Sequence, residues 1–363
     1  MNHGQCDERW ARGVVVHGMG RSGTSAITGL FVASGYYAGE AVDLMRPDPS
    51  NERGYYENLS VFGANEEVLG EFDASWYDPA DEATQTARGD ELRPRLAAVL
   101  DRLVQDSGSA PLALKDPRIG VMLPLWGPVL SGVLHPVLVI RDPIEIAFSL
   151  RRREDMPVPL GIAAWEVHMT TLLRHLAGVV VTVAPYRAVM AEPGVARAVV
   201  AAASEHMAVA QARCVHPSDG SDWLAPELRH NNAQSRDRRR YLTASQQELW
   251  TWLESLEPGN CELRPPPAFT EIPDASRAAV HQLSVLADRI SGLEQGLSRE
   301  RQGRQDDQQR AAEAYEHVQR VSDEAREAYE QTEKAYQVIV QSKSWRLTSL
   351  PRTVASTVRR LLA

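Results

Sequence analysis

The sequence has little cysteine, no long apolar run and no excess of positive charge. Its 363 residues include three cysteines, Cys6, Cys214 and Cys261, without CxxC spacing, which indicates neither a disulfide framework nor a cysteine zinc site. No run approaches the roughly 18 apolar residues of a membrane-spanning helix, and the N-terminus lacks the order of a secretory signal. The net charge of −9 disfavours a nucleic-acid binder. We therefore expect a cytoplasmic protein in which any anionic ligand is held by local groups.

Short apolar runs alternate with longer helical patterns from residue 12 to about 255, which is typical of an α/β domain. The runs have few polar interruptions, as expected for parallel strands covered by helices on both faces. We predict strands over residues 13–18, 110–115, 135–141 and 178–185, and helices over 25–34, 60–69, 92–104, 143–153 and 160–176. Residues 1–255 are thus predicted to form a three-layer α/β domain with a central parallel sheet, with ligands beyond the carboxyl ends of its strands.

The chain changes character near residue 256. Residues 256–274 are rich in proline without a sustained period, which favours a linker. Residues 275–343 hold a heptad register with core positions Leu283, Ile290, Leu297, Arg304, Ala311, Val318, Ala325, Thr332 and Ile339, and three residues later Leu286, Leu293, Glu300, Asp307, Ala314, Val321, Ala328, Ala335 and Ser342. This register predicts an α-helical coiled coil that joins copies of the chain or a partner protein. A single solvated helix is the alternative.

The last segment, residues 344–363, interleaves apolar residues with arginines and predicts a basic amphipathic tail. Such a tail suits peripheral contact with an anionic membrane surface. A helix cap or a partner-docking tail fits the same pattern.

A glycine-rich loop follows the first predicted strand in the segment VVVHGMGRSGTS. Its glycines, Gly18, Gly20 and Gly23, let the backbone turn and approach a ligand closely. The N–H groups of the turn and of the next helix would form an anion site. Arg21 adds a guanidinium that can hold a phosphate through two hydrogen bonds.

The loop differs from the P-loop of nucleotidases at one position. That motif is GxxxxGK[ST], whereas here Gly18 and Gly23 are followed by Thr24 and Ser25. The lysine that contacts β- and γ-phosphates is missing, which disfavours an ATPase or kinase. An ordinary glycine-rich strand-to-helix turn is the other interpretation.

A second candidate phosphate site lies in the segment RDPIEIAFS. Arg141 ends a predicted strand, and Pro143 suits the first turn of the next helix. Ser149 lies eight residues after Arg141, two turns along that helix. Together these two side chains could hold a second phosphate.

Both segments resemble motifs of the PAPS-dependent sulfotransferase family. HGMGRSGTS resembles the family's 5′-phosphosulfate loop in its arginine-bearing variant, and RDPIEIAFS resembles its 3′-phosphate motif. The segments ALKDPR and VVVTVAPYRAVMAEP lie where the family has a strand-end lysine and a further strand, so the resemblance covers about residues 12–200. It implies a P-loop-like sulfotransferase fold, and transfer of a sulfonate from 3′-phosphoadenylyl sulfate (PAPS) to a hydroxyl or amine without a metal.

The resemblance also implies roles for individual residues. The residues implied to hold the 5′-phosphate and sulfonate are Gly20, Arg21, Ser22, Gly23, Thr24 and Ser25, and those implied for the 3′-phosphate are Arg141 and Ser149. Cations near the departing bridging oxygen would supply electrostatic stabilisation, and Arg21 and Lys115 are the candidates.

A different catalytic base is needed, because Pro117 stands where cytosolic members of the family have a histidine. Arginine-loop relatives use a glutamate after the first helix, which favours Glu57, then Glu40. Asp116 comes third, since it could equally pair with Arg118.

We expect a hydroxyl acceptor on a carbohydrate or glycolipid of the cell envelope. A P-loop small-molecule kinase and a non-catalytic coiled-coil assembly protein with a degenerate nucleotide fold are the alternatives.

Overall fold

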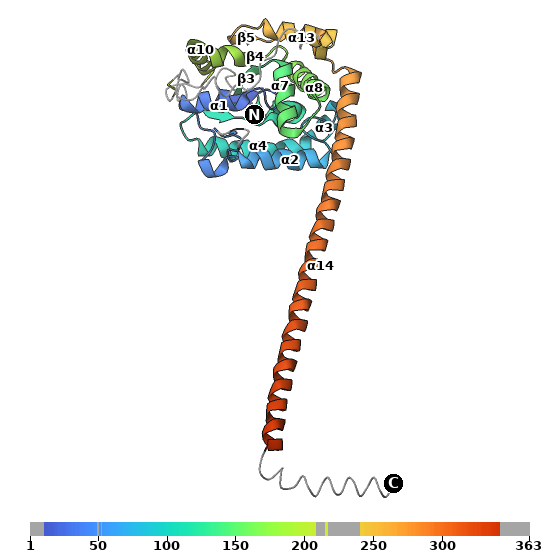
Figure 1. Cartoon of the computed structure of the whole chain (residues 1–363). Helices are drawn as coiled ribbons and strands as arrows, with labels where there is room; N and C mark the ends of the chain where they lie inside the picture. Colours follow the sequence, from blue (N-terminus) through green and yellow to red (C-terminus); the bar gives the residue numbers. More distant parts are fainter. Residues whose placement is uncertain (1–10, 49–50, 52, 208–214, 217–239, 342–363) are drawn as a thin grey trace, which may run out of the picture. The chain divides into compact units, whose positions relative to one another are not determined.

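The computed structural model describes residues 11–48, 51, 53–207, 215–216 and 240–341 (Figure 1). Over these residues the protein is an α/β structure with a five-stranded, mostly parallel sheet and a long C-terminal helix. The chain divides into two compact units, Met1–Ala287 and Asp288–Ala363. The sheet belongs to the first unit, and most of the long helix belongs to the second.

The sheet has the strand order β2-β1-β3-β4-β5. Its parallel strands are β1 (Gly13–His17), β2 (Leu112–Leu114), β3 (Leu134–Ile140) and β4 (Val180–Pro185). In the central register Val15 lies beside Leu114 of β2 and Pro136 of β3. All four strands coincide with the predicted apolar runs, and no end differs by more than two residues.

The fifth strand lies in a segment that we expected to be a linker. Residues 259–262 form β5 (Gly259–Glu262), which pairs antiparallel with β4, so that Val181 lies beside Cys261. A 3₁₀ helix, η3 (Pro267–Phe269), follows. The sheet is therefore not wholly parallel, and part of the segment 256–274 is an edge strand.

Helices cover both faces of the sheet. Val14 and Val16 of β1 pack in one apolar cluster, and Val15 packs in another, as expected when successive side chains of a strand point to opposite faces. The helices on the Val14 face are α1 (Thr24–Ala33), α9 (Tyr186–Ala191) and α10 (Pro193–Ser204). Those on the Val15 face are α2 (Leu59–Glu71), α4 (Gly89–Asp106), α5 (Pro117–Val121), α6 (Leu123–Leu130), α7 (Pro143–Glu154), α8 (Val158–Leu176) and α13 (Ala244–Glu254).

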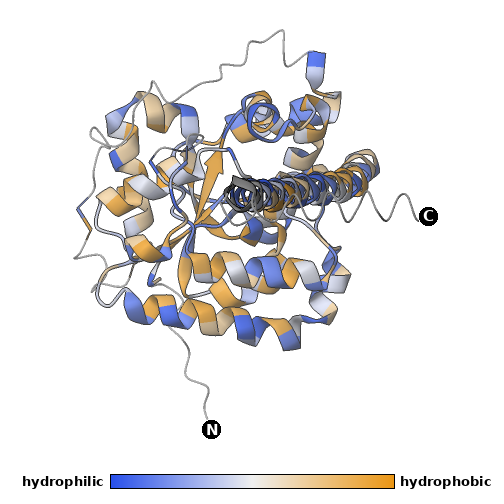
Figure 2. Cartoon of the chain, turned by 60° about the horizontal axis from the view of Figure 1, so that its bottom comes forward, coloured by the Kyte–Doolittle hydropathy of each residue, from blue (hydrophilic) through white to orange (hydrophobic). Residues whose placement is uncertain are grey.

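The five predicted helices correspond to α1, α2, α4, α7 and α8, whose ends differ from the predictions by up to three residues. Their apolar sides face the sheet, whose central strands are orange in Figure 2. Two further short helices are η1 (Ala41–Asp43) and α3 (Glu82–Ala87).

The long helix α14 (Asp274–Gln341) spans 68 residues. The predicted helix over residues 275–343 is thus confirmed up to residue 341, whereas its pairing stays a prediction. Its first turns pack on the α/β unit: Val280 is buried, and the Ser276 hydroxyl donates to the buried Glu166 carboxylate of α8. The predicted tail, residues 344–363, lies outside the described residues. Among the described helices, none has an apolar stretch long enough to cross a lipid bilayer.

Candidate functional site

The candidate site lies where the strand order reverses. From β1 the chain passes to β2 on one side, and β3 then returns to pair on the other side of β1. The connection after β1 therefore leads to one side of the strand order, and the connection after β3 leads to the other side. In open α/β sheets this switch point is the usual ligand site.

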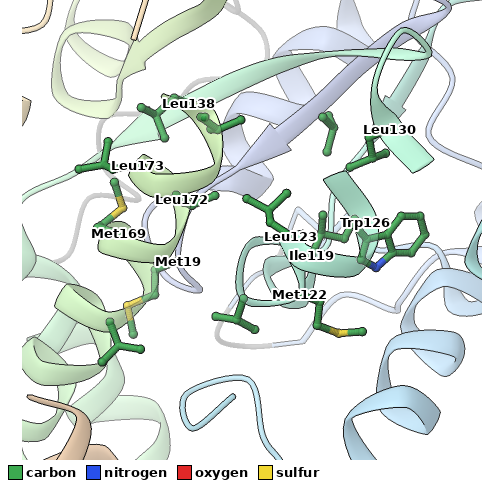
Figure 3. Close-up of a cluster of buried hydrophobic side chains, with 14 of the residues drawn as sticks. Met19, Ile119, Met122, Leu123, Trp126, Leu130, Leu138, Met169, Leu172 and Leu173 are labelled. Carbon is green, nitrogen blue, oxygen red and sulfur yellow. The ribbon is translucent and has the colours of Figure 1, made fainter. Parts of the chain in front are cut away.

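The loop after β1 is anchored at both ends. Met19 is fully buried in the core cluster, among side chains that include Met169 and Leu172 of α8 (Figure 3). Gly23 has φ 94°, and a Cβ there would lie 2.2 Å from the Tyr186 ring. Only glycine fits such a position without strain. The loop conformation is thus imposed by the packing around it.

The open side of the loop offers donors. A Cβ built on Gly20 would meet no atom within 4 Å. No side chain caps α1, whose N-cap residue is Gly23, so its first N–H groups stay available to an anion. Thr24 is buried, as is Ser22, whose hydroxyl has no hydrogen-bond partner in the part of the chain that the structure describes. A buried hydroxyl without a partner is costly, so Ser22 is a further donor that a bound anion would satisfy.

The two predicted phosphate segments meet in space. Arg21 Nε donates to Ser149 Oγ at 3.0 Å, and Arg141 Nη1 donates to the Arg21 carbonyl at 2.9 Å. The Arg141 guanidinium also lies 4.4 Å from the centre of the Tyr186 ring, and its Nε donates to Glu145 at 3.1 Å. The contacts of Arg21 with Ser149 and with Arg141 join residues that are 128 and 120 positions apart in the sequence.

Positive charge is concentrated around Arg21. Burial lowers the pKa of Arg21, and the neighbouring Arg153 and Arg141 lower it further. Tyr55 and Glu154 act in the opposite direction and partly raise it. Burial also raises the pKa of Glu154. An arginine stays charged under these conditions, so an anionic ligand would relieve the repulsion between the guanidinium groups.

Lys115 joins this loop to the segment before α2. It follows β2 directly, is only 3% exposed, and forms a salt bridge with Glu57. Its Nζ also donates to Ser25 Oγ at 3.4 Å and to the Tyr55 carbonyl at 3.3 Å. A lysine and a carboxylate therefore lie beside the first turn of α1.

Helix caps fix these side chains. Asn58 follows Glu57, and its Oδ1 accepts from Ser60 N at 2.9 Å to begin α2. Asp116 follows Lys115 and begins α5 in the same way, accepting from Arg118 N at 2.8 Å. Glu57 and Lys115 each lie one residue before the N-cap of a helix, which restricts their backbone.

The structure separates the three candidate bases. Glu57 is buried and contacts Lys115, whereas Glu40 is exposed at the N-cap position of η1. Within the described residues, no hydrogen bond or ion pair joins Glu40 to Lys115. Asp116 pairs with Arg118 at 3.1 Å, and burial raises the pKa of Asp116. Position therefore favours Glu57.

Sequence reasoning assigned no role to three residues that border the site. Tyr186 packs on Gly23 and Arg141, and Arg153 lies 5.2 Å from the centre of the Tyr55 ring. Two of them had a signal in the sequence: Tyr186 stands in the segment VVVTVAPYRAVMAEP, and Tyr55 lies two residues before the candidate base Glu57. Arg153 carried none.

The described part of the chain contains no group of three or more His, Cys, Asp or Glu side chains placed to hold a metal ion. Comparison of the chain with protein-family models, curated proteins and solved structures gave no match. The case for a function therefore rests on the residues of the site.

Proposed function

We propose that the protein is a PAPS-dependent sulfotransferase with the P-loop-like fold of that family. The observation that carries the proposal is the contact of Arg21 with Ser149 and of Arg141 with the Arg21 carbonyl. It joins the two segments that we predict to bind phosphate, and this supports a donor with separate 5′- and 3′-phosphates. The missing loop lysine fits the same donor, which has no β- or γ-phosphate.

The donor's 5′-phosphate and sulfonate lie over the loop from Gly20 to Ser25, and its 3′-phosphate lies against Arg141 and Ser149. The acceptor oxygen forms a bond to sulfur as the bond between sulfur and the bridging oxygen breaks. Adenosine 3′,5′-bisphosphate leaves with that electron pair. Arg21 and Lys115 stabilise the charge that develops on the bridging oxygen.

Glu57 takes the acceptor's proton in this mechanism. Its carboxylate contacts Lys115, which also reaches Ser25 on the donor loop. A lysine held between the loop and the carboxylate can turn toward the bridging oxygen when the donor binds. That movement frees a carboxylate oxygen of Glu57 for the acceptor hydroxyl.

The acceptor that we propose is a hydroxyl on a carbohydrate or glycolipid of the cell envelope, modified from the cytoplasmic side. Association through α14 and peripheral membrane contact through residues 344–363 belong to the same proposal. No metal takes part.

Label transfer tests the reaction. The purified chain is incubated with labelled PAPS or labelled ATP, with a panel of glycans, and with or without EDTA. We expect the label to pass from PAPS to a glycan, and we expect this transfer to continue when EDTA is present. Metal-dependent phosphate transfer from ATP would instead identify a kinase, and binding of both nucleotides without any transfer would identify a non-catalytic protein.

Arg141→Ala tests the assignment of the 3′-phosphate. It should weaken binding of adenosine 3′,5′-bisphosphate about tenfold to a hundredfold and leave AMP binding nearly unchanged, because hydrogen bonds to charged groups are strong. Isothermal titration calorimetry measures both ligands. Arg187→Ala is the control, since Arg187 is exposed on α9 beside Tyr186. Equal losses for both nucleotides would show that Arg141 does not bind the 3′-phosphate.

A further inference from the structure

The part of α14 in the second unit is a helix with an exposed apolar stripe. Ile290, Leu293 and Leu297 are 54–63% exposed, and Val318 and Val321 are 64% and 50% exposed. Glycines at 292, 296 and 303 lower the helix propensity of the same stretch. A long helix with this composition depends on packing against a partner.

Charged residues interrupt the stripe at its middle. Glu300, Arg304 and Asp307 occupy three successive core positions of the heptad register. Within one helix, Arg304 donates to Glu300 at 2.6 Å, and Asp307 lies 3.8 Å from Arg310. All four side chains are exposed.

Helix direction decides what these charges meet. In a parallel, in-register dimer each core position faces its own copy, so Glu300, Arg304 and Asp307 would form three consecutive layers of like charge. Like charges in a desolvated core are strongly unfavourable. The alanine positions 311 and 314 would face their own copies as well, leaving poorly filled layers.

An antiparallel dimer removes both problems. When Arg304 of one helix faces Asp307 of the other, the opposite charges form two symmetry-related pairs at the centre. Outward from this centre each layer combines a larger residue with a smaller one: Glu300 with Ala311, Leu297 with Ala314, Leu293 with Val318, and Ile290 with Val321.

We propose that the exposed stripe of α14 binds a second copy of this chain in antiparallel orientation, centred on Arg304 and Asp307. The amino ends of the two helices then lie at opposite ends of the dimer. This inference does not depend on the proposed enzymatic activity.

Disulfide trapping tests the orientation in the full-length chain. Leu297→Cys and Ala314→Cys are made separately in a background where Cys6, Cys214 and Cys261 are serine. Under mild oxidation, a mixture of the two variants should form an inter-chain disulfide, because these positions share a layer and lie within reach of one another. Neither variant alone should form one. Self-linking of Leu297→Cys alone would show a parallel dimer and overturn the proposal.

Light scattering on chains that keep their cysteines gives a second test. The unmodified chain should have the mass of a dimer, and a monomer mass at micromolar concentration would overturn the proposal. Arg304→Asp should weaken dimerisation about tenfold or more, since two attractive pairs become repulsive. The double variant Arg304→Asp with Asp307→Arg should restore it. Arg299→Asp, at an exposed position outside the core register, is the matched control, and an equal effect there would contradict the central pairing.

Discussion

Two ion pairs of similar chemistry lie in different parts of the molecule. In the α/β unit, Lys115 and Glu57 are 3% and 8% exposed, whereas Arg304 and Glu300 on α14 are 75% and 58% exposed. Exposed pairs on helices contribute about 0.3–0.5 kcal/mol. A buried charge without its partner costs several kcal/mol. The same contact is therefore a structural necessity in one place and a small surface contribution in the other.

The surroundings of the two pairs differ as well. Arg118 Nη1 lies 3.8 Å from Glu57, and Lys115 contacts Ser25 on the first turn of α1. A change in the buried pair therefore reaches the candidate donor loop. On α14 the charges of the isolated chain pair with residues three or four positions away, so a change there stays local until a second helix binds.

Glu57→Gln should have the largest effect. It leaves Lys115 without its counter-charge, so we expect the free energy of unfolding to fall by about 4 kcal/mol. If Glu57 is the base, turnover should also fall about 10²- to 10⁴-fold. Urea unfolding and label transfer measure the two effects. Glu300→Gln is the matched control, and comparable destabilisation by both substitutions would contradict the difference in burial.

Most of the sheet could be predicted because burial leaves a local signal. The runs that became β1 and β3 are apolar except for one histidine each, His17 and His135, and they are followed by Gly18 and by Arg141. The edge strand β5 has no such signal, since its residues, Gly259–Glu262, alternate between half-buried and exposed and are mostly polar. Pairing with β4 determines this strand, and a non-local contact of this kind does not appear in a sequence pattern.

The grouping of Arg21, Arg141 and Ser149 could also be predicted, but the choice between the candidate carboxylates could not. Glycines and arginines at strand ends indicate an anion site by their type and spacing. Glu57 and Glu40 lie in one irregular stretch with no period, so nothing local separates them. What separates them is Lys115, which contacts Glu57 although it lies 58 residues away from Glu57 in the sequence.

Gly23 and Gly108 both have a positive φ, but only Gly23 is packed against another side chain. Gly23→Ala and Gly108→Ala therefore test what the packing contributes. At Gly23 the new Cβ would meet the Tyr186 ring and require a left-handed backbone, which should lower the free energy of unfolding by about 3 kcal/mol. Gly108 also has a left-handed φ, 58°, but open space around it. Gly108→Ala should therefore cost only about 1 kcal/mol. Urea unfolding separates the two, and equal losses would show that Tyr186 does not restrain the loop.

Two histidines, one buried and one exposed, should differ in how they make the free energy of unfolding depend on pH. His168 of α8 is buried, and among the described residues neither of its ring nitrogens has a hydrogen-bond partner. Burial, with His17 nearby, lowers the pKa of His168 to about 3. His281 on α14 is 71% exposed.

The folded state binds fewer protons at His168 than the unfolded state, so the stability that neutral His168 contributes is present above about pH 6.5 and lost as the pH falls toward the folded pKa. This single group should account for about 2 kcal/mol of the stability lost between pH 7 and pH 5. Urea unfolding across this range should show that loss reduced in His168→Met and retained in His281→Gln. If both variants kept the wild-type dependence of stability on pH, His168 would have to be accessible to protons in the folded state, and its burial would not determine its charge.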